Sequence, residues 1–147
     1  MTHYVRPAET PVAATDYVEV QHFYARHMAM LDAGEAGRWA GTFSEDAIFE
    51  EPGRLQPLQG RDAIFASAQA RADRVSAEGV QFRHWVGMIS VTAGPAGALH
   101  AHYYALVLAV PRGGPVEVRA SVDCRDVLVR QNDELLVRHR LLSVDGS

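Results

Sequence analysis

The sequence predicts an α+β domain in which a strongly curved antiparallel β-sheet forms a cone and three N-terminal helices close a central pocket. Two observations carry this prediction. Apolar residues recur at helical spacing in the first half of the chain, whereas four long runs rich in Val, Leu, Tyr and Arg fill the second half. Short turns separate these runs, and short turns between long strands imply an antiparallel meander.

The helices are expected to come first. Asp16 and Glu19 resemble a capping box at the start of the first helix, whose apolar stripe ends at Gly34. A short second helix is expected over residues 35–42, and Asp62 is expected to open a third. The residues before the first helix, 1–15, are expected to form a flexible arm, which leaves 16–147 as one domain.

A short strand that ends in Glu50 and Glu51 is expected between the second and third helices, and four long strands are expected after the third helix. Long strands twist and curl, and a curled sheet closed by helices encloses a cone-shaped cavity. The four runs cover approximately residues 81–93, 97–110, 115–131 and 134–144.

Composition limits the classes of function. A chain of 147 residues that is 48% hydrophobic has enough material for one core with an internal pocket. The net charge of −4 and the lack of a basic block argue against nucleic acid as a partner. The only cysteine, Cys124, excludes an internal disulfide. No membrane-length apolar run or signal-peptide pattern is present, so we expect a cytoplasmic protein that does not bind membranes.

Two adjacent carboxylates end the first predicted strand. Glu50 and Glu51 follow Ile48 and Phe49 and precede Pro52. Side chains alternate across a strand, so one glutamate is expected to point inward if the other points outward. A carboxylate facing an apolar cavity could serve as a general base or acid, and the alternative is that both are surface charges.

The predicted sheet offers further ionisable candidates. His84 alternates with Phe82, Val86 and Met88, so it is either a proton donor in a pocket or a satisfied core group. Asp126 shares a face with apolar neighbours, where it is expected to be protonated or matched to His84 or His27. Asp123 takes the opposite face and stays a reserve candidate, because a β-bulge would exchange the two faces.

The remaining candidates line the expected pocket. His27 lies on the apolar stripe of the first helix and is either a packed core histidine or a catalytic group. No metal or other cofactor is expected, since no histidine pair with an assured carboxylate neighbour is present. The expected substrate-binding residues are Tyr24, Trp39, Phe49, Met88 and Tyr104.

Residues 16–144 resemble the nuclear-transport-factor-2-like superfamily, which includes SnoaL-like polyketide cyclases, ketosteroid isomerase and scytalone dehydratase. The stretch from Leu31-Asp32-Ala33-Gly34 to Glu50-Glu51-Pro52 is similar to the isomerase segment around its catalytic base. This resemblance implies that Glu51 is the base, and it places His27 where the isomerase has an oxyanion tyrosine. The segment from Asp126 to Arg130 resembles the strand on which the isomerase and the cyclases carry a functional aspartate, at Asp126.

A second resemblance concerns the dehydratase. The segment Gln81-Phe82-Arg83-His84-Trp85-Val86-Gly87 is similar to the strand of scytalone dehydratase that carries a catalytic histidine, which implies a role for His84. Asp32 corresponds to an aspartate on the first helix of that enzyme.

The resemblance implies a cofactor-independent cyclase, dehydratase or isomerase of secondary metabolism, acting on a hydrophobic oxygenated small molecule such as an aromatic polyketide intermediate. Glu51 or Asp126 would take a proton beside a carbonyl, and His84 and His27 would donate hydrogen bonds. The alternative is a non-catalytic small subunit or binding protein, because the closing segment 137–140 also looks like dioxygenase β subunits.

A homodimer is expected in either case. The outer sheet face is predicted to be partly apolar, because it carries Val127 and Val129 beside Arg119 and Arg125.

Overall fold

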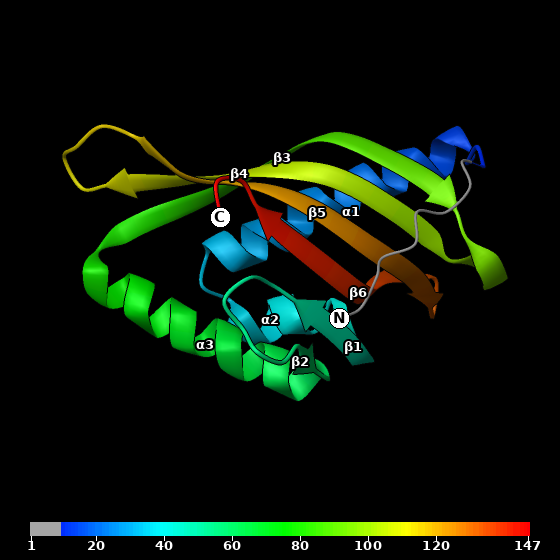
Figure 1. Ribbon diagram of the computed structural model, residues 1–147, viewed down its shortest axis with the longest axis horizontal. Coiled ribbons are helices and arrows are strands. Elements are labelled where there is room, and N and C mark those ends of the chain that lie inside the picture. The colour runs from blue at the N-terminus through cyan, green and yellow to red at the C-terminus, as the bar shows by residue number, and fades with distance from the viewer. Residues whose placement is uncertain (1–9) are drawn as a thin grey trace.

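A computed structural model describes residues 10–147, and Figure 1 shows its architecture. The elements, in chain order, are α1 (Ala14–Asp32), α2 (Ala36–Ala40), β1 (Phe43–Glu50), β2 (Leu58–Gln59), α3 (Arg61–Glu78), β3 (Val80–Ala93), a 3₁₀ turn (Pro95–Gly97), β4 (Leu99–Pro111), β5 (Glu117–Gln131) and β6 (Glu134–Val144).

The predicted α+β fold with a curved sheet and three helices is confirmed. All six strands form one sheet in the order β2-β1-β6-β5-β4-β3. The sheet is mixed, because β1 runs parallel to β6 while the other neighbours are antiparallel. In Figure 1 the long strands sweep across the molecule as one curved layer, and α2 and α3 lie to one side of it. Helix α1 packs against β3, and α3 packs against α2 and β1.

The predicted capping box at the start of α1 does not form. The helix begins at Ala14, and Ala13 caps it without a side-chain hydrogen bond. The carboxylates of Asp16 and Glu19 instead bind Arg130 of β5, at 3.0 Å and 2.7 Å. Most of the predicted arm, residues 1–9, lies outside the described residues, and no helix within residues 10–147 is long and apolar enough to span a membrane.

Turn chemistry at Asn132-Asp133 fits the predicted hairpin. Both residues have positive φ, 52° and 62°, as a two-residue type I′ turn between twisted strands requires. This tight turn joins β5 to β6.

Two β-bulges set which side chains face inward. In β3, Gly87 pairs with Tyr104 but Ser90 pairs with His102, so one extra residue is inserted around Met88, whose φ is 55°. In β6, Val137 pairs with Leu128 but His139 pairs with Val127, which leaves Arg138 unpaired and exposed. Each bulge reverses the face on which the following side chains lie.

Candidate active-site cavity

A cavity of about 820 Å³ lies between α3 and the inner face of the sheet. Trp39 and Phe49 supply aromatic walls, and alanines of α3 leave the space open. The polar groups in its wall include His84 and Glu51. A smaller recess of about 520 Å³ lies between α1 and β3, and its lining shares Met28 and His84 with the larger cavity.

His84 forms a close pair with Asp32, the last residue of α1. The ring Nδ1 lies 2.5 Å from Asp32 Oδ1, and the backbone N–H of His84 donates to Oδ2 at 3.1 Å. Each of these side chains is only 11% exposed. A carboxylate accepts hydrogen bonds, so the contact places the ring proton on Nδ1. No residue among 10–147 hydrogen-bonds to Nε2, which leaves its lone pair available in the cavity wall.

The two neighbouring glutamates point to different partners. Glu51 lines the cavity and accepts a hydrogen bond from Arg54 Nε at 2.5 Å. Glu50 lies 2.6 Å from His139 Nε2 instead. Arg54 also donates to Ser67 of α3 at 2.8 Å, so Glu51 belongs to a partly exposed polar edge of the cavity.

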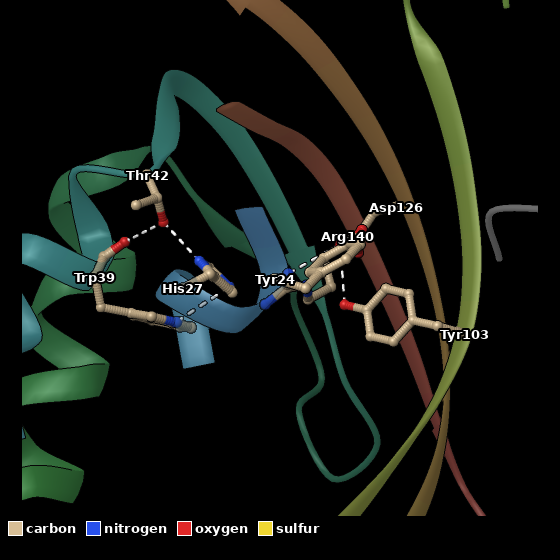
Figure 2. A network of polar contacts seen from close by, with 7 residues as sticks. All are labelled: Tyr24, His27, Trp39, Thr42, Tyr103, Asp126 and Arg140. Atoms are coloured by element: carbon tan, nitrogen blue, oxygen red, sulfur yellow. Dashed lines mark hydrogen bonds and ion pairs between the residues drawn. The ribbon is translucent and has the colours of Figure 1, made fainter. Parts of the chain in front are cut away.

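Asp126 is fully buried. The sequence offers His84 or His27 as its partner, but neither histidine contacts it, and Arg140 takes that place. Arg140 of β6 donates from Nε to Oδ1 and from Nη2 to Oδ2, both at 2.9 Å. The hydroxyls of Tyr24 and Tyr103 donate to Oδ2 at 2.7 Å and 3.0 Å, as Figure 2 shows. With four donors around it, the Asp126 carboxylate is occupied.

Electrostatics keep the donors of this network protonated. Burial, followed by the charge of Asp126, raises the pKa of Tyr24 well above its usual value, and burial also raises the pKa of Tyr103. Burial alone would lower the pKa of Arg140, but the Asp126 carboxylate outweighs it and the net shift is upward. The network is therefore a structural ion pair rather than a proton acceptor poised for catalysis.

His27 is buried in the aromatic core and does not line the cavity that holds His84 and Glu51. Figure 2 shows its two hydrogen bonds: Nδ1 contacts Thr42 Oγ1 at 2.7 Å, and Trp39 Nε1 donates to Nε2 at 3.1 Å. The Thr42 hydroxyl donates to the Trp39 carbonyl at 2.5 Å, so Nδ1 must carry the ring proton. Burial, then the charges of Arg140 and His84, lowers the pKa of His27 well below its usual value. His27 is thus a neutral core group.

The expected substrate-binding residues divide into three groups. Trp39 and Phe49 line the main cavity as predicted, whereas Tyr24 lines the smaller recess. Met88 is 78% exposed, because the bulge in β3 turns it outward. Tyr104 is 52% exposed, since the alternation of β4 puts its neighbour Tyr103 inside. The predictions for Met88 and Tyr104 were therefore wrong.

Sequence analysis missed several polar residues of the cavity. Tyr103 pairs in register with Cys124, which lies two residues before Asp126 on the same face of the strand, so counting across the hairpin of β4 and β5 could have found it. The buried thiol of Cys124 also lines the cavity, and burial raises its pKa to about 12. Within residues 10–147 no group of three or more His, Cys, Asp or Glu side chains is arranged to hold a metal ion.

Comparison with known proteins identifies the family of this curved-sheet domain. The SnoaL-like domain matches residues 12–141, and the chain belongs to this family. The resemblance to the SnoaL-like branch of the superfamily is thereby confirmed. No curated protein matches the chain.

Several solved structures are similar over nearly their whole length. Aln2 from a Streptomyces species is 37% identical, with 93% of this chain and 95% of that chain covered and a TM-score of 0.85. ActVI-ORFA from Streptomyces coelicolor is 31% identical, with 92% and 98% covered and a TM-score of 0.84. A protein from Catenulispora acidiphila in complex with S-DNPA is 37% identical, with 91% and 96% covered and a TM-score of 0.80.

Proposed function

We propose that this protein is a cofactor-independent enzyme that transfers a proton beside a carbonyl group of an aromatic, polyketide-type small molecule. The observation that carries the proposal is the 2.5 Å contact between Asp32 and His84, whose ring lines the main cavity, while Asp32 lines the adjoining smaller recess. A histidine oriented by a carboxylate, with its second nitrogen free, is a general base.

The proposed chemistry follows from the tautomer. With the proton on Nδ1, the lone pair of Nε2 takes a proton from the carbon next to the carbonyl, and the C–H electrons become the enolate. The Asp32 carboxylate stabilises the imidazolium that forms. The Nε2–H then returns its proton to a leaving hydroxyl in a dehydration, or to another carbon in an isomerisation. In a cyclisation the enolate carbon attacks a second carbonyl carbon of the same molecule, the C=O π bond breaks, and the resulting alkoxide takes the proton from Nε2–H.

Two further observations support a small-molecule substrate. A cavity of about 820 Å³ with aromatic and alanine walls is in the range of ligand pockets in proteins. The Catenulispora acidiphila neighbour was solved in complex with S-DNPA. Membership of the SnoaL-like family, together with the resemblance to polyketide cyclases, supports the aromatic polyketide class.

The alternative, a non-catalytic subunit that holds a partner, is favoured by the exposed apolar side chains of Trp85, Tyr104 and Leu106. A partner-holding subunit has no need for an open interior. The open cavity, with His84 in its wall and Asp32 paired to that histidine, therefore supports the enzymatic proposal over this one.

Deuterium exchange tests the proposal without knowledge of the natural substrate. 2-Tetralone, a bicyclic aromatic ketone, is incubated with the protein in D₂O, and exchange beside the carbonyl is followed by NMR. We expect the protein to accelerate exchange, and His84→Ala to lower this acceleration by about 100-fold or more. Asp32→Asn should also lower it, because the ring loses the group that orients it.

The control is His22→Ala, which removes an exposed histidine of α1, the helix that carries Asp32, and should leave exchange unchanged. Equal exchange with and without protein, or full acceleration in His84→Ala, would contradict the proposal. Glu51→Gln separates the two candidate bases. If it abolishes exchange while His84→Ala does not, the base is Glu51.

A further inference from the structure

The charge of the main cavity is opposite to that of the chain. The chain carries a net charge of −4, yet four arginines line the cavity and Glu51 is the only carboxylate in its lining. Arg140 is neutralised by Asp126 and Arg54 by Glu51. The two remaining arginines, Arg71 and Arg74, have no hydrogen bond or ion pair to a carboxylate within residues 10–147.

These two arginines lie on one face of α3. Ser67, Arg71 and Arg74 are spaced by four and three residues, which places them side by side along the helix, and all three line the cavity. Ala63, Ala66 and Ala70 on the same helix also line it. These small side chains precede the two arginines along the helix and leave room for a ligand in the cavity beside them.

Arg71 is held in place but not neutralised. Its guanidinium lies 5.2 Å from the centre of the Phe82 ring, a stacking contact that fixes its orientation. It is half-buried, and burial lowers its pKa. The negative charge of Asp32 raises the pKa of Arg71 and the positive charge of Arg74 lowers it, so Arg71 lies close to both groups. Asp32 is engaged by His84, which leaves a positive charge in a partly desolvated wall.

We propose that Arg71 and Arg74 form a subsite for a carboxylate group of the substrate, so that the cavity takes an aromatic carboxylic acid in preference to a neutral ring system. Arg71 is half-buried and Arg74 is exposed, and neither is paired with a carboxylate among residues 10–147. Guanidinium groups left without such a partner favour an anion, and the planar fork of arginine matches a carboxylate. The subsite shares its cavity with His84, so a bound carboxylate would anchor the molecule while its carbonyl region lies at the reactive histidine. This inference rests on the proposed use of the cavity as the substrate site.

A matched pair of probes tests the charge preference. 2-Naphthoate and 2-naphthamide have the same rings and nearly the same shape, but only the first is an anion at pH 7. We expect calorimetric titration of the wild-type protein to show naphthoate binding about tenfold or more tighter than naphthamide. Arg71→Gln and Arg74→Gln should each reduce this ratio, and the double variant should bring it close to one. Arg38→Gln removes the same charge from an exposed arginine paired with Glu35, outside the cavity lining, and should keep the ratio.

Three outcomes would overturn the inference: equal binding of the two probes to the wild-type protein, no binding of naphthoate, or a preference that persists in the double variant. 2-Naphthyl phosphate distinguishes the anion. If it binds through the arginines and naphthoate does not, the subsite is for a phosphate ester and the carboxylate assignment is wrong. His84→Ala should keep the charge preference while losing exchange activity, so a failed subsite and a failed catalytic proposal give different results.

Discussion

Asp126 and Arg140 face each other across neighbouring strands and form two parallel hydrogen bonds, each of 2.9 Å, at the centre of the protein. Both side chains are almost completely buried, with exposures of 0% and 3%. Such a pair is costly to break, because removing one partner leaves the other charge unsolvated and unpaired. Asp126, which sequence resemblance marked as a proton-transfer group, is here a structural residue that joins α1, β4, β5 and β6.

Asp126→Asn should therefore act on stability. We expect a loss of about 3–5 kcal/mol in the free energy of unfolding, measured by urea denaturation, because the Arg140 charge becomes uncompensated. Asp123→Asn is the control, since Asp123 lies on the other face of β5 and is about one-third exposed. This variant should lose less than about 1 kcal/mol in the free energy of unfolding. If the Asp126→Asn variant kept its stability but lost exchange activity, Asp126 would instead be catalytic.

His27 predicts a stability loss in mild acid. Its pKa is about 6.5 in the unfolded chain and is lowered in the fold, mainly by burial. Below about pH 6.5 the unfolded state takes up a proton that the folded state does not, so the free energy of unfolding falls by up to about 1.4 kcal/mol per pH unit until the folded-state pKa is reached. Urea denaturation between pH 7.5 and pH 5 measures this slope.

The matched variants isolate the contribution of His27. His27→Asn removes the titrating ring and should flatten the slope, at a lower overall stability. His22→Ala, on the exposed face of the same helix, should keep the wild-type slope. If His27→Asn keeps that slope as well, another group is responsible.

Cys124 should be chemically inert in the folded protein. With a pKa of about 12, only about one molecule in ten thousand carries the reactive thiolate at pH 8. We expect no labelling by iodoacetamide in the native state and complete labelling in denaturant, measured by mass spectrometry with Cys124→Ser as the blank. Rapid labelling of the native protein would show that burial does not protect the thiol.

The sequence predicts a homodimer through the outer sheet face that carries Val127 and Val129 of β5. These two side chains are only partly exposed, and we expect the second copy over the exposed apolar side chains of β3 and β4. Trp85 and Leu106 pair across the two strands and are 66% and 43% exposed, and Tyr104 lies next to them. We expect sedimentation equilibrium at micromolar concentration to give a dimer, and Leu106→Arg to give a monomer. Val18→Arg, which charges an exposed valine on α1, should leave the dimer intact. A wild-type monomer under these conditions would contradict the expectation.

Local signals in the sequence predicted most of the fold. Helical spacing located α1 and α3, and Asn132-Asp133 located the hairpin between β5 and β6 within a residue. The sequence also placed His84 on an inner face and pointed, by resemblance, to Asp32. These features depend on residues close together in the chain or on a short motif.

Two differences between the predicted and the observed site arise where strand pairing shifts by one residue, whereas Tyr104 faces outward through the ordinary alternation of β4. Counting outward from the tight turn at Asn132-Asp133 would place His139 opposite Asp126. The bulge at Arg138 shifts the register and brings Arg140 there instead. The bulge in β3 turns Met88 outward in the same way. The extra residue is left unpaired, so alternation counted on one side of the bulge predicts the wrong face for the residues on the other side.

Three side chains of helix α1 contact three parts of the molecule that lie far apart in the sequence. Tyr24 reaches Asp126 of β5, His27 reaches Thr42 before β1, and Asp32 reaches His84 of β3. Two of these anchors are fully interior, so the helix cannot slide or rotate without rupturing the core. A single residue inserted between Tyr24 and Asp32 would swing the carboxylate by about 100° around the helix axis. The register of α1 against the core thus sets the alignment of the reactive imidazole. The segment between Tyr24 and Asp32 should tolerate substitutions far better than insertions or deletions.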